Sequence, residues 1–205
     1  MCSEAIVDLY ERHANEFDKH RGRSLQEKAW LDKFLSYVPP SGGVLDVGCG
    51  MGEPIAGYLI EAGHQVVGID SSPSLIHMCR TRFPTSQWVL ADMRQMALAR
   101  RFDGLLAWDS FFHLNVDDQR AMVARFAAHA LPGAPLMFTS GPAHGEAIGT
   151  FCGEPLYHAS LDPDEYRQLL VANGFSVLSY LADDPTCGEH TVWLARYDVT
   201  ARDAA

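Results

Sequence analysis

Short apolar runs alternate with apolar residues at helical spacing along this chain. A strand buried on both faces reads as a nearly continuous apolar run, whereas a helix repeats its apolar positions every three or four residues. The apolar runs predict five strands, at residues 44–47, 64–70, 87–91, 102–108 and 134–140. The helical pattern predicts helices at residues 3–20, 24–37 and 116–130.

Proline, glycine and capping residues mark further helices between these strands. Pro54 suits the first turn of a helix and Gly63 its C-terminal cap. A second helix is expected from Ser72 and Pro73, since serine caps helices and proline favours their first position. Another is expected after Asp162, where an acidic capping box begins a segment that ends at residues 173–174.

Two late apolar segments, residues 175–182 and 190–197, flank a short acidic loop and predict an antiparallel hairpin at the sheet edge. Alternating strands and helices predict an α/β fold, with one doubly wound, mostly parallel sheet of seven strands. We expect the 205 residues to form one domain. Its expected parts are a helical cap or lid (1–40), a binding core (41–140), a long loop (141–160) and a helix with the hairpin (161–205).

Glycines and acidic residues follow several of the predicted strands. The glycine-rich segment 48–52 follows the first strand, and Asp70, Asp92 and Asp109 follow the next three. Parallel sheets of this kind bind ligands beyond the carboxyl ends of their strands. We therefore expect these residues to gather at one edge of the sheet.

The charges around the glycine segment indicate the kind of ligand. Alternate glycines let a backbone approach a ligand closely, and Asp70 is placed to bind both hydroxyls of a ribose. Asp46, just before the glycines, would repel a pyrophosphate. It suits a nucleoside that carries positive charge instead, and S-adenosylmethionine has both a sulfonium and an ammonium group.

The motifs together resemble those of class I S-adenosylmethionine-dependent methyltransferases. The segment Asp46-Val47-Gly48-Cys49-Gly50-Met51-Gly52 resembles the glycine-rich first motif. Gly68-Ile69-Asp70-Ser71-Ser72 resembles the second, Ala91-Asp92-Met93 the adenine-binding segment, and the stretches at 102–114 and 131–134 the later ones. The resemblance is good over residues 40–140, and it is nearest to small bacterial enzymes that act on small molecules. It implies a single Rossmann-like domain with an N-terminal helical lid.

The resemblance implies a role for each motif residue. The cofactor S-adenosylmethionine, and its product S-adenosylhomocysteine, would be held by Asp46, Gly48, Gly50, Gly52, Asp70, Ser71, Asp92, Met93 and Trp108. Structural explanations remain open for these residues: the glycines could form a tight connection, Asp70 and Asp92 could cap helices, and Met93 and Trp108 could be core.

Candidate catalytic residues lie after the fourth strand and in the long loop. His113 is the first candidate for a general base, because histidine titrates near neutral pH, although a packing role is equally compatible with its position. Long loops in compact domains often bind ligands, so Tyr157 and His158 are expected to face the substrate, unless the loop is a solvated excursion. Tyr10 and Phe17 share a helical face that could serve a lid or a core contact.

Composition restricts the partners and the compartment. A net charge of −10 disfavours nucleic acid, and no apolar run is long enough to cross a membrane. Five cysteines without a paired spacing indicate reduced thiols in a cytoplasm, with no secretory signal. A metal site from Cys152, His158, Cys187 and His190 is conceivable, but none is expected. We expect a small-molecule methyl acceptor, no nucleic acid or membrane partner, and a monomer or homodimer.

Three rival functions remain at this stage. An NAD(P)-dependent oxidoreductase could use a similar sheet, but the glycine spacing, Asp46 and the lack of a Tyr-x-x-x-Lys pair disfavour it. A non-catalytic module that only binds S-adenosylmethionine is the second. The third, a nucleic-acid methyltransferase, is disfavoured because residues 108–111 lack the Asn/Asp-Pro-Pro-Tyr motif.

Overall fold

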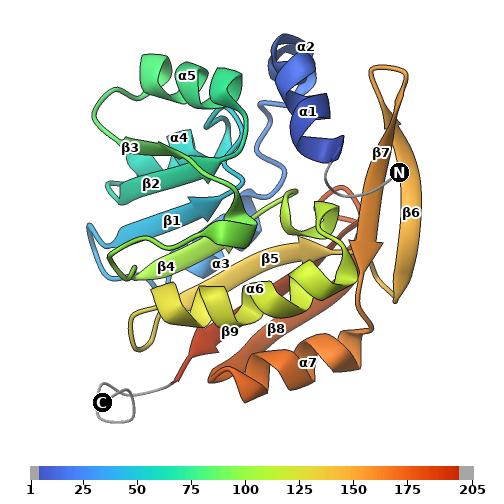
Figure 1. Ribbon diagram of the computed structural model, residues 1–205. Coiled ribbons are helices and arrows are strands. Elements are labelled where there is room, and N and C mark those ends of the chain that lie inside the picture. Colours follow the sequence, from blue (N-terminus) through green and yellow to red (C-terminus); the bar gives the residue numbers. More distant parts are fainter. Residues whose placement is uncertain (1–4, 199–205) are drawn as a thin grey trace.

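The computed structural model describes residues 5–198, and its main sheet has seven strands (Figure 1). Their order is β3-β2-β1-β4-β5-β9-β8, in which the first five run parallel and the last two antiparallel to their neighbours. The strands are β1 Gly43–Val47, β2 Gln65–Asp70, β3 Gln87–Leu90, β4 Gly104–Ala107, β5 Pro135–Ser140, β8 Phe175–Asp184 and β9 His190–Tyr197. The expected α/β, Rossmann-like architecture is confirmed, including the C-terminal hairpin.

Helices cover both faces of the sheet. One face packs on α6 (Val116–His129) and α7 (Pro163–Ala172), with Phe111, Phe126 and Tyr166 among the buried side chains. The other face packs on α3 (Lys28–Leu35), α4 (Ile55–Glu61) and α5 (Pro73–Arg82). Both layers exclude water from the sheet, which leaves the strand ends as the place where polar residues can meet a ligand.

The helix starts follow the capping residues in the sequence. Ser72 caps α5, since its hydroxyl accepts a hydrogen bond from the Leu75 N–H at 3.2 Å. Asp162 caps α7 in the same way through the Asp164 N–H. Such side chains satisfy backbone N–H groups that the helix cannot pair itself.

The expected first helix is two helices. The chain breaks at His13 between α1 (Ala5–Arg12) and α2 (Ala14–His20). The second expected helix is confined to α3, because Leu25 adopts a left-handed backbone conformation with φ 50°. Helices α1 and α2, which we call the lid helices, lie between α5 and a separate two-stranded hairpin (Figure 1).

The expected long loop at residues 141–160 is mostly a hairpin. Strands β6 (Gly145–Phe151) and β7 (Glu154–Ser160) pair antiparallel and form their own sheet. The turn residues Cys152 and Gly153 both have positive φ, 51° and 79°, as a tight two-residue hairpin turn requires. Glycine and proline are disfavoured in strands, so the sequence pattern of this segment does not predict a hairpin.

Candidate active site

The glycine segment forms the turn between β1 and α4. The N–H groups of Gly48 and Cys49 both donate to the Ile69 carbonyl of the neighbouring strand, at 2.8 and 3.0 Å. Gly48 has φ 75°, and a Cβ added there would lie 2.3 Å from the Cβ of Ser110. Only glycine therefore allows the segment after β4 to approach the turn so closely.

Asp70 fixes this turn from the end of β2. One carboxylate oxygen accepts the Gly50 N–H and the other the Ser72 N–H, both at 2.9 Å. Burial raises the pKa of Asp70 to about 6, while these backbone donors act in the opposite direction. Asp70 and Ser71 line a cavity together with Asp92 and Met93.

Asp46 lies deeper, at the end of β1, and its side chain is buried. Among residues 5–198, no group donates a hydrogen bond to its carboxylate. Burial and the negative charge of Asp70 raise the pKa of Asp46 to about 7, and the nearby Arg21 opposes this. A buried carboxyl without a donor is a natural partner for a positively charged ligand.

Two cavities meet at the glycine turn. The first runs from Asp92 and Met93 to His113, and the second extends from Asp46 to Gly52 and Trp108. Both are lined by Phe17, Gly48, Gly50 and Asp109, so these residues mark the junction. Every residue that the sequence assigned to the cofactor thus lies along one of two adjoining cavities.

Three of these residues also have structural roles. Asp92 caps the short helix η1 (Met93–Gln95) and binds Arg94 through both oxygens, at distances of 2.6–3.1 Å. Met93 packs against the core, and the Trp108 ring lies 5.4 Å from the His190 ring. Asp92, Met93 and Trp108 therefore have the structural roles that the sequence left open, and they also line the cavities.

His113 stands at the far end of the first cavity, in the short helix η2 (Phe111–His113). Its Nδ1 lies 2.9 Å from the Tyr157 carbonyl, which can only accept a hydrogen bond. Its Nε2 lies 3.1 Å from the Tyr10 hydroxyl. Burial lowers the pKa of His113 to about 4, so the ring is neutral, carries its proton on Nδ1 and accepts the Tyr10 hydrogen on Nε2.

The other two catalytic candidates lie elsewhere. The Tyr157 side chain is buried against Ile6, and its hydroxyl donates to Glu146 at 2.9 Å. His158 lines a neighbouring groove between β5, η2 and the hairpin, and its ring centre is 4.9 Å from that of His113. Neither side chain lines the two cavities above; the Tyr157 backbone, however, holds His113.

Asp109 joins the two cavities and is held by several contacts. It has a left-handed backbone, φ 51°, and its N–H donates to the Thr139 hydroxyl at 2.9 Å. Its carboxylate lies 2.8 Å from His190 Nε2 and 3.8 Å from Arg21. The second ring nitrogen of His190 faces the Cys187 carbonyl, so both nitrogens meet hydrogen-bond acceptors. The Asp109 hydrogen bond raises the pKa of His190, which favours the imidazolium.

The lid helices close the cavities from above. Tyr10 and Phe17 line the first cavity, and their rings lie 5.1 Å apart. Glu11 accepts hydrogen bonds from Ser72 and Ser74 at the start of α5, at 2.5 to 3.0 Å. On the other side, Arg12 and His13 each lie 2.6 Å from a Glu154 oxygen in the hairpin.

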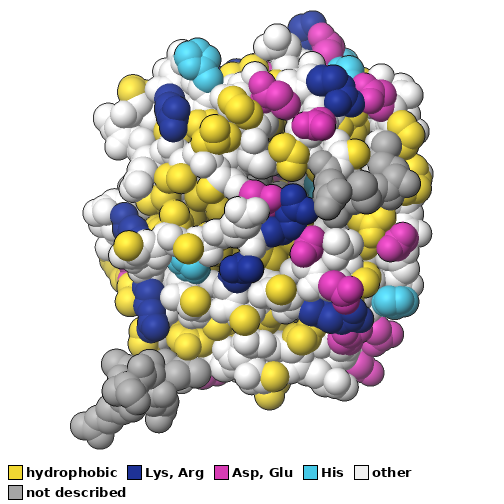
Figure 2. All heavy atoms as spheres, in the orientation of Figure 1, with side chains coloured by type: hydrophobic (Ala, Val, Ile, Leu, Met, Phe, Trp, Pro, Cys, Tyr) yellow, Lys and Arg dark blue, Asp and Glu magenta, His cyan; other side chains and the backbone are white. Residues whose placement is uncertain are grey.

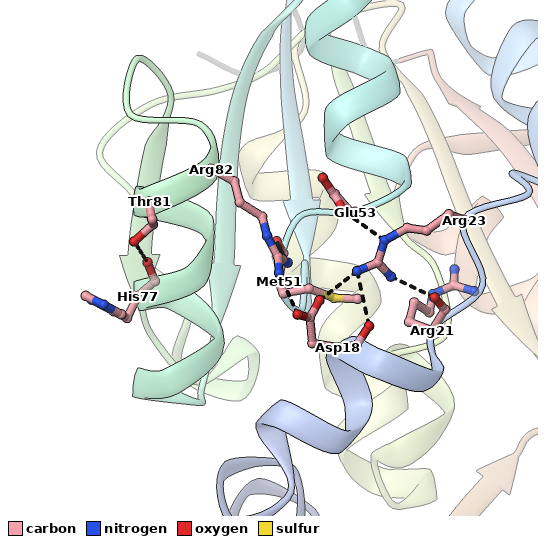
Figure 3. A network of polar contacts seen from close by, with 8 residues as sticks. All are labelled: Asp18, Arg21, Arg23, Met51, Glu53, His77, Thr81 and Arg82. Carbon is pink, nitrogen blue, oxygen red and sulfur yellow. Dashed lines mark hydrogen bonds and ion pairs between the residues drawn. The ribbon is translucent and has the colours of Figure 1, made fainter.

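A second group of ion pairs anchors α2 near the glycine turn (Figure 3). Asp18 lies between two arginines and contacts both Arg82 of α5 and Arg23, each at 2.6 Å. Arg23 in turn contacts Glu53, just beyond the glycines, at 2.7 Å. These pairs connect the lid to the elements that form the cavity floor.

Several site residues were not identified from the sequence. Arg21 and Ser110 line the cavities, and Tyr10 was considered only as a lid or core residue. Asp109, which the sequence places at the same sheet edge as the glycines because it follows a strand, lines both cavities. The contact between Tyr10 and His113 joins residues 103 positions apart and has no signal in the sequence.

Neither a metal site nor a membrane span is found among residues 5–198. No group of three or more His, Cys, Asp or Glu side chains there is arranged to hold a metal ion. Within the same residues, no helix combines the length and the apolar character needed to cross a bilayer. Cys49, Cys79, Cys152 and Cys187 are free thiols.

Comparison with known proteins gives a consistent family. Residues 44–133 match the model of a methyltransferase domain. An O-methyltransferase of Pyrenophora dematioidea is 30% identical over 158 residues, which cover 70% of this chain and 58% of that protein. A dTDP-3-amino-3,4,6-trideoxy-alpha-D-glucopyranose N,N-dimethyltransferase of Streptomyces venezuelae is 30% identical over 128 residues, 59% of this chain and 54% of that protein. The chain thus spans little more than half the length of these curated relatives.

Solved structures share the whole fold. The 1,6-didemethyltoxoflavin-N1-methyltransferase of Burkholderia thailandensis, solved with bound 1,6-didemethyltoxoflavin and S-adenosylhomocysteine, superposes with a TM-score of 0.73 at 20% identity. The match covers 96% of this chain and 89% of that one. The motif residues, the cavities beside them and these similarities together identify the chain as a member of the class I S-adenosylmethionine-dependent methyltransferase family.

Proposed function

We propose that this protein transfers a methyl group from S-adenosylmethionine to a nitrogen, oxygen or sulfur atom of a small molecule. The observation that carries the proposal is the convergence of Asp46, the glycine turn and Asp70 on two adjoining cavities under a closed lid. Asp46, a buried carboxyl without a hydrogen-bond donor among residues 5–198, suits the positive end of this cofactor, and the Asp70 carboxylate suits its ribose hydroxyls.

The cavity residues fit the cofactor in three parts. Asp46 would meet the ammonium group of the methionine end, and Arg21, which lines the same cavity, would meet its carboxylate. Asp70 would bind the ribose hydroxyls, and Asp92 with Met93 would flank the adenine. The reacting centre would then lie at the junction of the two cavities, next to Asp109.

The chemistry needs little from the protein beyond alignment. When bound, the cofactor's sulfonium supplies an activated methyl group for in-line displacement. Holding two reactants in attack geometry can contribute about 7–11 kcal/mol to catalysis. The Tyr10–His113 pair lies on the wall of this cavity, and its two ring systems are fixed by the lid and by the Tyr157 carbonyl.

His113 acts here by positioning rather than as a strong base. With a pKa of about 4 it stays neutral at physiological pH and takes up a proton weakly. His158 and Tyr157 are proposed to shape the substrate entrance, with His158 on the adjacent groove and Tyr157 supporting the hairpin.

The proposed partner is a small molecule. On the face shown in Figure 2, Lys and Arg side chains are scattered among acidic and apolar ones, without one basic patch. A net charge of −10 also disfavours a polyanion. We further propose a cytoplasmic location, supported by the free thiols within residues 5–198, and a monomer or homodimer.

Isothermal titration calorimetry and a methyl-transfer assay test this function. We expect S-adenosylmethionine and S-adenosylhomocysteine to bind, and NAD(H) and NADP(H) not to bind, because Asp46 would face their pyrophosphate. Release of S-adenosylhomocysteine with a panel of small molecules would separate an enzyme from a binding module. Binding of a nicotinamide nucleotide in place of S-adenosylmethionine would overturn the proposal in favour of an oxidoreductase.

A further inference from the structure

Four polar side chains surround the end of the first cavity next to the proposed reacting centre. They are Tyr10, Asp109, Ser110 and His113, which we call the polar cluster. Asp109 also lines the second cavity, which places the cluster at the junction where the two cavities meet. A substrate that approaches the methyl group at this junction would make polar contacts with these side chains.

The hydrogens of the polar cluster are already committed to protein groups. The His113 Nδ1–H donates to the Tyr157 carbonyl, and the Tyr10 O–H donates to His113 Nε2. The Ser110 O–H donates to the Val47 carbonyl at 2.6 Å. A carbonyl oxygen accepts only, so the direction of each of these bonds is fixed.

The cluster therefore presents lone pairs to the cavity. The Tyr10 and Ser110 oxygens keep accepting capacity after donating their single hydrogens, and the Asp109 carboxylate accepts only. The cations that line the two cavities or face the cluster are already paired with carboxylates. Arg94 binds Asp92 through both oxygens. Arg21 binds Glu27 at 2.9 Å and lies 3.8 Å from Asp109, whose other oxygen is 2.8 Å from His190 Nε2.

Because the polar cluster offers hydrogen-bond acceptors to the cavity, we propose that the methyl acceptor is an amine. A primary amine can keep two N–H bonds to the polar cluster while its lone pair points at the methyl group. An alcohol has a single O–H to donate, and a carboxylate has none and would meet the charge of Asp109. The proposal rests on the proposed function and specifies the substrate class of the same site.

The reaction balances without a further reactant. An alkylamine is an ammonium ion at neutral pH, so it first releases one proton to water. The neutral nitrogen then gives its lone pair to the new C–N bond, while the C–S bond of the methyl donor breaks and its electron pair goes to sulfur. The methylated nitrogen is again an ammonium ion, so the reaction releases one proton in all. A strong base is not required, in agreement with a neutral His113.

Matched probes test the amine assignment. We would compare 2-phenylethylamine, 2-phenylethanol and phenylacetate as methyl acceptors. A second series would carry an amine, an alcohol or a carboxylate on a cyclohexylmethyl group. One readout is the shift in melting temperature of the 205-residue protein saturated with S-adenosylhomocysteine. The other is the methylated product, measured by mass spectrometry after incubation with S-adenosylmethionine. We expect shifts and products with the amines alone.

The variant Asp109→Asn reverses the hydrogen-bonding direction at one atom, since its amide donates where a carboxylate oxygen accepted. We expect kcat/KM for the amines to fall roughly 10- to 100-fold, as for loss of a charge-assisted hydrogen bond. Asp117→Asn is the matched control, because Asp117 is exposed on α6 and pairs only with Arg120 among the contacts described. The melting temperature without ligand shows whether Asp109→Asn remains folded.

The outcomes separate the two proposals. Methyl transfer to the alcohols or carboxylates at a rate equal to that of the amines overturns the amine assignment and leaves the methyltransferase function standing. Amines that neither shift the melting temperature nor become methylated, while S-adenosylmethionine binds, also overturn the amine assignment. Absence of cofactor binding overturns the proposed function itself.

Discussion

At the scale of single residues, the site depends on two carboxyl groups with different surroundings, the buried Asp46 and the partly buried Asp70. Asp70 accepts two backbone N–H bonds, whereas Asp46 has no donor among the described residues. Asp70 was identified from its spacing and Asp46 from its place before the glycines. Their burial, and so their raised pKa values, depends on packing by distant elements and could not be predicted from the sequence.

The raised pKa of Asp46 predicts that cofactor binding releases protons. Its pKa of about 7 means that about half of the ligand-free molecules carry a proton there at neutral pH. A cationic ligand beside Asp46 lowers this pKa, so binding should release about half a proton at pH 7. Affinity for S-adenosylmethionine should therefore increase from pH 6 to pH 8.

Calorimetry in buffers of different ionisation enthalpy measures this proton release. Asp46→Asn should weaken binding and abolish the dependence on the buffer. A wild-type binding enthalpy that is the same in every buffer at pH 7 would show that Asp46 does not meet the positive end of the ligand.

Asp70 leads to a prediction about affinity. Asp70→Ala leaves ribose hydroxyls unpaired at a cost of about 1–3 kcal/mol, or roughly 5- to 150-fold in affinity. The variant also loses the bond to the Gly50 N–H, so its melting temperature must be measured beside the calorimetric titration. Unchanged affinity in a folded variant would remove Asp70 from the ribose site.

At the scale of elements, the lid helices and the hairpin were the least predictable parts. Five parallel strands and the C-terminal hairpin follow from apolar runs and capping residues, because those signals are local. The hairpin β6–β7 has two glycines and a proline in its strands and packs against both η2 and α1, so its pairing has no strong local signal. The contacts of Phe151 with Tyr10 and Phe17 likewise appear only in three dimensions.

The ion pairs of the lid predict a kinetic effect. Asp18→Asn weakens the contacts with Arg82 and Arg23, so the lid should open more often and release the cofactor sooner. Partly exposed pairs contribute about 0.2–1 kcal/mol, which corresponds to dissociation faster by roughly 1.5- to 5-fold.

Stopped-flow displacement of S-adenosylhomocysteine measures this rate. Glu16→Gln is the matched control on the same helix, since Glu16 pairs with Lys19 and His20 of that helix. Equal dissociation rates for the two variants would mean that the Asp18 pairs do not hold the lid closed.

At the scale of the whole molecule, the raised carboxyl pKa values link stability to pH. The folded-state pKa values of Asp46 and Asp70, about 7 and about 6, exceed the unfolded value near 3.9, so the folded protein binds more protons in this range. The free energy of unfolding without ligand should therefore rise by about 1 kcal/mol as the pH falls from 8 to 6.5. His190, whose pKa is raised by Asp109, acts in the same direction.

Chemical denaturation at several pH values tests this linkage. Asp46→Asn should flatten most of the dependence, and saturating S-adenosylmethionine should flatten it in the wild type, because a bound cation keeps Asp46 ionised. A stability that falls between pH 8 and pH 6.5 would contradict the burial of these carboxyl groups.

A crystal structure with S-adenosylhomocysteine bound tests the central claim most directly. We predict the amino group of the homocysteine end beside Asp46, the ribose hydroxyls on Asp70, the adenine between Asp92 and Met93, and the sulfur at the junction near Asp109. A nucleoside bound in the reverse direction, with its adenine at Asp46, would contradict this account of the site.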